Sequence, residues 1–102
     1  MDRLDQLREM LKEDEYDPFL HYAVGLELVK KQYYQEAMTS FQQVLKLDEG
    51  YIAAYYQLGL IFIQLDIVDV ARTYIEKGIS KAIDKKDFKS KGELEELLEG
   101  IE

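Results

Sequence analysis

The sequence has no cysteine and no tryptophan, and only one histidine and one proline among its 102 residues. Without cysteine there is no disulfide framework, thiolate metal site or cysteine nucleophile, and one histidine excludes a multi-histidine metal site. The longest apolar-rich window, 52–65, is shorter than the roughly 18 apolar residues of a membrane span and contains two glutamines. The charged stretch 1–15 has no apolar core of signal-peptide type. These absences favour a soluble, cytoplasmic protein.

Negative charge predominates, with 13 Lys and Arg against 21 Asp and Glu and a net charge of −8. Such an acidic chain lacks the basic footprint of a nucleic-acid binder and is repelled by anionic membrane surfaces. The apolar fraction of 47% is too high for a disordered tail. Residues 1–17 hold seven acidic and three basic side chains, and residues 84–102 hold seven and four. We interpret this acidity at the two ends as a solubility device rather than as part of a binding surface.

Apolar residues recur with helical spacing along the whole chain, and strand signals are poor. The short connections favour helices that pack antiparallel on their neighbours, which predicts an all-α domain. The spacing predicts six helices, at about 2–13, 18–31, 35–47, 52–65, 68–84 and after Ser90. The helix at 52–65 is apolar nearly all round, so it is expected to be the most buried.

Several residues are expected to begin or end these helices. Asp17 precedes the single proline and is a plausible N-cap for the second helix. Gly50 is expected to close the third helix in the left-handed conformation. Asp66 is expected to cap the fifth helix, and Ser90 and Glu93 have the spacing of a capping box for the sixth.

The sequence repeats itself at an offset of 34 residues. Gly25 falls on Gly59, and Ala37 falls on Ala71. The same offset pairs Tyr22 with Tyr56, Val24 with Leu58, Leu28 with Phe62, and Phe41 with Ile75. The register extends backward, because 10–15 falls on 44–49. A fixed period of this length is the signature of a repeat architecture.

The two copies resemble the tetratricopeptide repeat, a helix–turn–helix unit of 34 residues. The family pattern is matched as His21-x2-Val24-Gly25-x2-Leu28…Ala37-x3-Phe41 and as Tyr55-x2-Leu58-Gly59-x2-Phe62…Ala71-x3-Ile75. The sequence departs from it at Glu49 and Ile83, which stand at the usual late proline. The resemblance implies a right-handed α-solenoid of antiparallel helix pairs, with each glycine at a close approach of two helices and each alanine opposite. It divides a single domain, 1–102, into a half-repeat helix (2–17), two repeats (18–51 and 52–85) and a capping helix (86–102).

Little in the sequence suggests catalysis or metal binding. His21 lies at a core position of the repeat, and its neighbours offer no nucleophile to activate. The acidic cluster at 13–17 lacks the alternating ligands and the glycine of a calcium loop. No nucleotide-binding, hydrolase or zinc motif is present. We therefore predict a protein that is not an enzyme and has no cofactor and no metal.

The resemblance also implies a concave face, lined by the first helix of each repeat, that takes a peptide or a partner helix. The predicted partner-binding residues are Phe19, Tyr22, Leu26, Val29 and Lys30 in the first repeat and Ala53, Tyr56, Leu60, Ile63 and Gln64 in the second. One subset of the family clamps C-terminal carboxylates with Lys and Asn. Tyrosine and leucine hold the corresponding positions here, which disfavours such a clamp.

An apolar stripe of this kind is unusual on a monomer, and three explanations stay open. The stripe binds a segment of a partner protein, or it pairs with its own copy in a homodimer. Alternatively the last helix folds back and covers the stripe with Leu94, Leu97, Leu98 and Ile101. The leading hypothesis is a non-catalytic protein-interaction module or scaffold, and the alternative is a structural repeat protein that self-associates.

Overall fold

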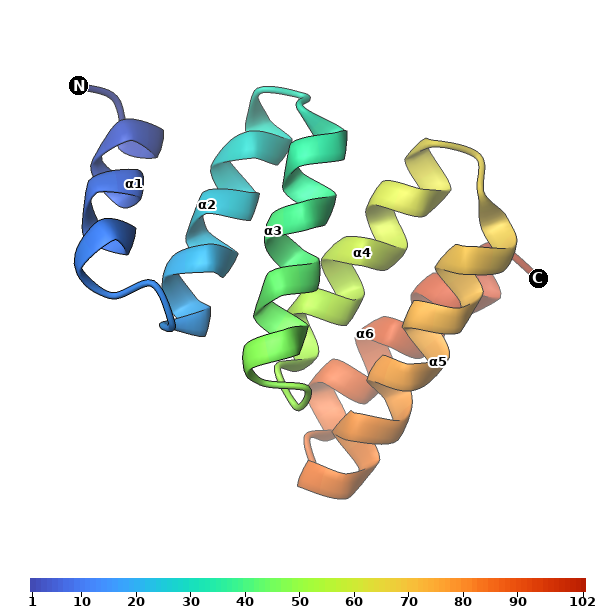
Figure 1. Cartoon of the computed structure of the whole chain (residues 1–102). Coiled ribbons are helices and arrows are strands. Elements are labelled where there is room, and N and C mark those ends of the chain that lie inside the picture. Colours follow the sequence, from blue (N-terminus) through green and yellow to red (C-terminus); the bar gives the residue numbers. More distant parts are fainter. The chain divides into compact units, whose positions relative to one another are not determined.

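The computed structural model describes residues 1–102, and all of its regular structure is helical (Figure 1). The six helices are α1 (Arg3–Glu13), α2 (Pro18–Lys30), α3 (Tyr34–Leu47), α4 (Ile52–Gln64), α5 (Val68–Lys85) and α6 (Phe88–Glu99). The bounds predicted for the first five helices agree to within one residue. None of the helices combines the length and the apolar composition that crossing a bilayer requires.

The chain divides into two compact units, residues 1–49 and residues 50–102. In the first unit, α2 packs on both α1 and α3; in the second, α5 packs on both α4 and α6, and α6 also touches α4. Consecutive helices within each unit run antiparallel (Figure 1). The division lies two residues before the boundary expected between the repeats, and the single domain over 1–102 stays a prediction.

Each unit has its own apolar core, and no polar or charged side chain is buried in either one. In the first unit, Leu7 of α1 and Leu28 of α2 are almost completely buried, and Phe41 of α3 is completely so. In the second unit the core includes Leu58, Ile75 and Leu94, one from each helix. As predicted, α4 has more buried residues than any other helix.

The repeat glycines lie where a side chain of the next helix comes close. A Cβ atom built on Gly25 would lie 2.5 Å from Cε1 of Phe41, and one on Gly59 would lie 2.7 Å from Cγ1 of Ile75. Both distances are far below van der Waals contact, so these positions exclude any larger residue without rearrangement. The close approach was predicted, but the atoms nearest the glycines belong to Phe41 and Ile75 rather than to the alanines.

Three of the four predicted helix ends are wrong. Gly50 is not left-handed, because α3 already ends at Asp48, an extended residue through which the chain leaves the helix. Asp66 does not cap α5, whose N-cap residue is Ile67, without a side-chain bond. Ser90 lies inside α6, and Asp87 caps that helix, accepting hydrogen bonds from the Ser90 backbone N–H (3.1 Å) and hydroxyl (2.7 Å). Only Asp17 caps its helix as predicted.

The left-handed conformation occurs instead at Gln32, Asp66 and Lys86, with φ of 64°, 60° and 57°. Each follows a helix, and in each case the next residue's backbone N–H donates to a carbonyl five residues earlier. The bonds are Tyr33 to Leu28 (2.9 Å), Ile67 to Phe62 (2.8 Å) and Asp87 to Ala82 (2.9 Å). This is the Schellman closure, made here without glycine.

Candidate interaction surfaces

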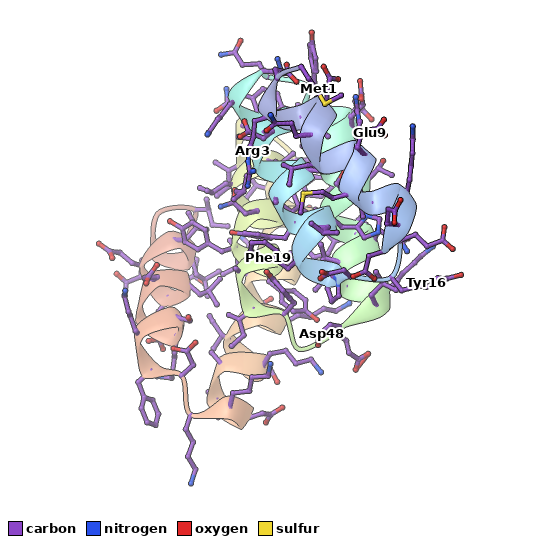
Figure 2. All side chains as sticks on the ribbon, turned by 90° about the vertical axis from the view of Figure 1, so that its left-hand side faces the viewer. Met1, Arg3, Glu9, Tyr16, Phe19 and Asp48 are labelled. Atoms are coloured by element: carbon purple, nitrogen blue, oxygen red, sulfur yellow. The ribbon has the colours of Figure 1, made fainter.

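The predicted binding face of the first repeat lies on α2, and none of its five residues is buried. Phe19 and Lys30 are exposed, and Phe19 keeps 58% of its surface in contact with solvent near the start of the helix (Figure 2). Tyr22, Leu26 and Val29 are half-buried. The face is therefore a partly exposed apolar strip that begins at Phe19 and ends at a lysine.

Two of these α2 residues also serve the fold. The ring of Tyr22 packs on that of Phe41, with ring centroids 5.5 Å apart. The ammonium of Lys30 lies 3.5 Å from the carboxylate of Glu27 on the same helix. Tyr22 is therefore as much a packing residue as a surface residue, whereas Phe19 is held by no ring contact.

The predicted face of the second repeat lies on α4. Ala53, Leu60 and Gln64 are exposed, Leu60 by 37%, whereas Tyr56 and Ile63 are half-buried. All five residues thus keep solvent contact within their unit.

The last helix covers this α4 face only in part. A Cβ atom on Gly59 would lie 3.5 Å from Cδ2 of Leu97, which shows that α6 reaches α4 at this glycine. Leu94 packs instead near Gly78 of α5, where a Cβ atom would lie 3.0 Å from its Cδ1. The neighbouring Leu60 remains exposed.

His21 has a structural partner. Its Nε2 lies 2.7 Å from the backbone carbonyl oxygen of Glu15. Because a carbonyl oxygen can only accept, Nε2 carries the proton and donates it, which fixes the tautomer of the ring. The bond ties α2 to the turn that precedes it.

The acidic cluster at 13–17 forms no metal site, and nowhere in the structure do three His, Asp or Glu side chains gather so as to hold an ion. Asp17 uses its carboxylate to accept the backbone N–H of Phe19 at 2.9 Å. Tyr16, beside it, projects from the turn between α1 and α2 (Figure 2). The cluster lies at helix ends, where its charges remain in water.

A shallow cavity of about 340 Å³ opens among the three helices of the first unit. It is lined by Arg8 and Leu11 of α1, by His21, Val24 and Leu28 of α2, and by Glu36, Thr39 and Ser40 of α3. A salt bridge between Arg8 and Glu36, 3.3 Å long, spans it and joins α1 to α3. The charged groups that line this cavity therefore already pair with each other.

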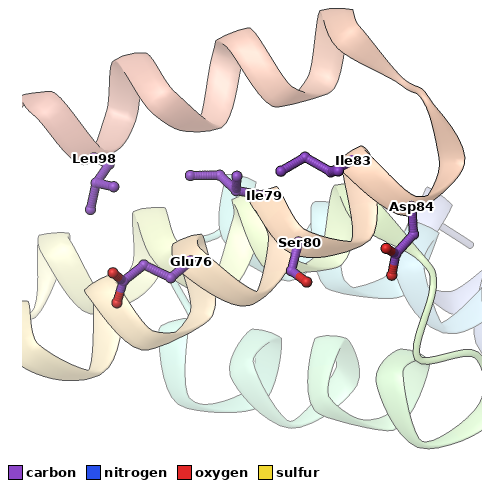
Figure 3. Close-up of a pocket in the computed structure, with 6 residues that line it drawn as sticks. All are labelled: Glu76, Ile79, Ser80, Ile83, Asp84 and Leu98. Carbon is purple, nitrogen blue, oxygen red and sulfur yellow. The ribbon is translucent and has the colours of Figure 1, made fainter.

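A second cavity, of about 350 Å³, lies along α5 and α6. Its lining residues are Glu76, Ile79, Ser80, Ile83 and Asp84 of α5 and Leu98 of α6 (Figure 3). We did not predict this groove. The signal for it was present, because Leu94 and Leu98 repeat the spacing of Leu58 and Phe62.

The helix pairs, the repeat glycines and the six-helix order can be compared with known proteins. A family model described as TPR repeat matches residues 25–66. The solution structure of a tetratricopeptide repeat domain protein from Salinibacter ruber is 30% identical, covers 84% of this chain and 87% of its own, and has a TM-score of 0.80. The chain belongs to the tetratricopeptide repeat family. The crystal structure of such a protein from Salinibacter ruber gives 29% identity, coverage of 83% and 96%, and a TM-score of 0.78.

A more distant comparison extends the tetratricopeptide fold over nearly the whole chain. The solution structure of a protein from Bordetella parapertussis is 21% identical, covers 99% of this chain and 88% of its own, and has a TM-score of 0.86. At that identity the likeness concerns the fold alone. No curated protein matches the sequence. The tetratricopeptide repeat is in general a protein-interaction module, and this is the functional class that the family assigns.

Proposed function

We propose that this chain is a non-catalytic interaction module that binds a peptide or a partner helix through the apolar faces of α2 and α4. The observation that carries the proposal is the solvent exposure of Phe19 and Leu60, large apolar side chains at predicted binding positions. Exposed aromatic and aliphatic groups that gain burial on binding are typical anchors of protein interfaces. A cytoplasmic location and an exclusively protein or peptide partner belong to the same proposal.

The alternative, self-association through these faces, leads to a different outcome in solution. A homodimer buries the same apolar side chains against a second copy, so its population rises with concentration. Light scattering over a hundredfold range of protein concentration separates the two cases. A constant monomer mass excludes the homodimer, whereas a mass that rises toward twice the monomer value supports it.

The test of partner binding uses substitutions that leave the core intact. Phe19→Asp and Leu60→Asp each place a charge on one face, whereas Tyr22 is avoided because its ring packs on Phe41. Phe88→Asp is the matched control, since Phe88 is 69% exposed and belongs to neither face. Affinity purification from native lysate with mass spectrometry should show proteins that the wild type and Phe88→Asp retain and the two face variants lose.

The opposite result would count against the proposal. If both face variants fold normally by circular dichroism and keep the same bound proteins and the same mass in solution, the faces of α2 and α4 are not the binding site.

A further inference from the structure

Helix α6 carries an apolar pair at the same spacing as a buried pair of α4. Leu94 and Leu98 are four residues apart, like Leu58 and Phe62 in α4. Phe62 is almost fully buried, and its ring stacks on Tyr74 of α5 at a centroid distance of 5.6 Å. Leu94 is almost completely buried, but Leu98 is only half-buried. Within residues 1–102, no further helix packs over Leu98 as α5 packs over Phe62.

The side of Leu98 that lacks such a partner forms the wall of the groove along α5. Figure 3 shows Leu98 pointing from α6 toward α5, while Ile79 and Ile83 extend into the space between these two helices. Ile83 keeps 51% of its surface exposed. Three aliphatic side chains thus line an open groove of about 350 Å³ that runs parallel to the helices. A groove with this direction and with aliphatic side chains along it can accommodate a single helix packed alongside α5 and α6.

Negative charge borders this groove. Glu76 and Asp84 lie on the side of α5 away from α6, with Ser80 between them (Figure 3). Both carboxylates are exposed, and neither is paired with a cation of the chain. They are eight residues apart on one helix, which separates them by about 12 Å along its axis. A helix that lies along α5 meets both carboxylates only if its own cations are seven or eight positions apart.

Helix α6 is also acidic toward its end. Residues 93–99 include four glutamates and no basic residue, at 93, 95, 96 and 99, but none of the four lines the groove. Of these, Glu95 is partly buried and pairs with Lys91 at 3.2 Å. Glu76 and Asp84 are the only charged side chains that line the groove, which favours a cationic partner over an acidic one.

We propose that the groove between α5 and α6 binds an amphipathic helix of a partner protein with a basic flank. Apolar residues of this helix, three or four positions apart, pack on Ile79, Ile83 and Leu98. Lysine or arginine seven or eight positions apart pairs with Glu76 and Asp84. The N-terminal helix of a second copy fits this site less well, because it belongs to a segment with seven acidic and only three basic residues, and light scattering tests the other surfaces of a second copy.

The test presents the intact chain with a phage-displayed library of helical peptides, 16 residues long, randomised on an alanine-rich framework. Peptides selected on the wild type and not on Ile83→Asp should combine an apolar stripe with Lys or Arg seven or eight positions apart. Ile83 is half exposed, so the aspartate should leave the fold intact, and circular dichroism checks this.

Fluorescence anisotropy with one selected peptide then tests the contribution of the two carboxylates of α5. The double substitution Glu76→Lys with Asp84→Lys should weaken binding about tenfold, because two exposed ion pairs are lost and replaced by repulsion. Glu93→Lys is the matched control, since this exposed glutamate of α6 does not line the groove, and it should change the affinity by less than twofold. Phe19→Asp and Leu60→Asp should leave the affinity unchanged, which separates this site from the faces of α2 and α4.

Three results would overturn the inference. The first is that the peptides selected on the wild type show no enrichment in basic residues, and the second is that all of them bind Ile83→Asp as tightly as the wild type. Alternatively, light scattering finds a dimer that Ile83→Asp dissociates, in which case a second copy and not a basic helix occupies the groove.

Discussion

Gly25→Ala isolates the effect of a single methyl group where Gly25 of α2 lies close to Phe41 of α3. The added Cβ would lie 2.5, 2.6 and 2.9 Å from three ring atoms of Phe41. The ring is completely buried and cannot swing into solvent. Either the ring or one helix must move, and both belong to the core of the first unit.

The expected magnitude combines two opposing effects. Forcing an extra carbon into a packed core costs about 1–3 kcal/mol. Replacing glycine by alanine inside a helix stabilises it by about 1 kcal/mol. The net change at Gly25 is therefore expected to lie between about zero and 2 kcal/mol of destabilisation.

Gly92→Ala supplies the matched control within α6. A Cβ atom on Gly92 meets nothing within 4 Å, so the alanine gains its helical preference without a packing cost. This variant should be about 1 kcal/mol more stable than the wild type. The difference between the two variants then measures the packing cost alone, about 1–3 kcal/mol.

Urea unfolding followed by circular dichroism measures both variants. Truncating the ring should relieve the strain, so Phe41→Leu should cost less in the Gly25→Ala protein than in the wild type. Equal stability of Gly25→Ala and Gly92→Ala would refute the close approach. So would strictly additive effects of Gly25→Ala and Phe41→Leu.

Three further predictions concern hydrogen bonds made by side chains at the starts of α2 and α6. Asp17→Ala removes the N-cap of α2 and should lower the free energy of unfolding by about 1 kcal/mol in urea titrations. His21→Phe keeps a ring but loses the bond to the Glu15 carbonyl, so it should cost about 1 kcal/mol in the same assay; no change would contradict a structural role. The bonds that Asp87 accepts from the hydroxyl and backbone N–H of Ser90 lower its pKa below 3.8. Its stabilisation is therefore present above that pH and is lost as the pH falls through the lowered pKa. Asp87→Asn keeps a cap without titrating, so thermal melts should show a smaller loss of stability below pH 4; identical pH profiles would contradict this.

The helices and the repeat could be predicted because they depend on patterns that extend over many residues. The apolar spacing fixed the first five helices to within one residue, and the 34-residue offset located Gly25 and Gly59. Helix ends depend on only one or two residues, and most of the helix ends predicted from the sequence were wrong. Gly50 was the obvious candidate for a left-handed residue, yet the chain adopts that conformation at Gln32 and Asp66, where the backbone closure outweighs the steric cost of a side chain.

The surfaces were less predictable than the fold. The repeat register identifies which residues of α2 point away from the core, but it does not show that Tyr22 also packs on Phe41. The groove along α5 depends on how far α6 covers that helix. Ile79 is only half-buried, and it lines the groove together with Leu98. Such partial coverage is a property of tertiary packing, and the spacing of Leu94 and Leu98 indicates it only indirectly.

The pairing of each helix with its sequence neighbour bears on how the chain folds. In both units the contacts join α1 to α2, α2 to α3, α4 to α5 and α5 to α6, so few residues distant in sequence must meet. Closing such short loops costs little chain entropy, and proteins of low contact order fold within microseconds to milliseconds. Residues 1–49 form a compact unit with an apolar core of its own. During synthesis that unit can begin to form while the ribosome is still adding the second.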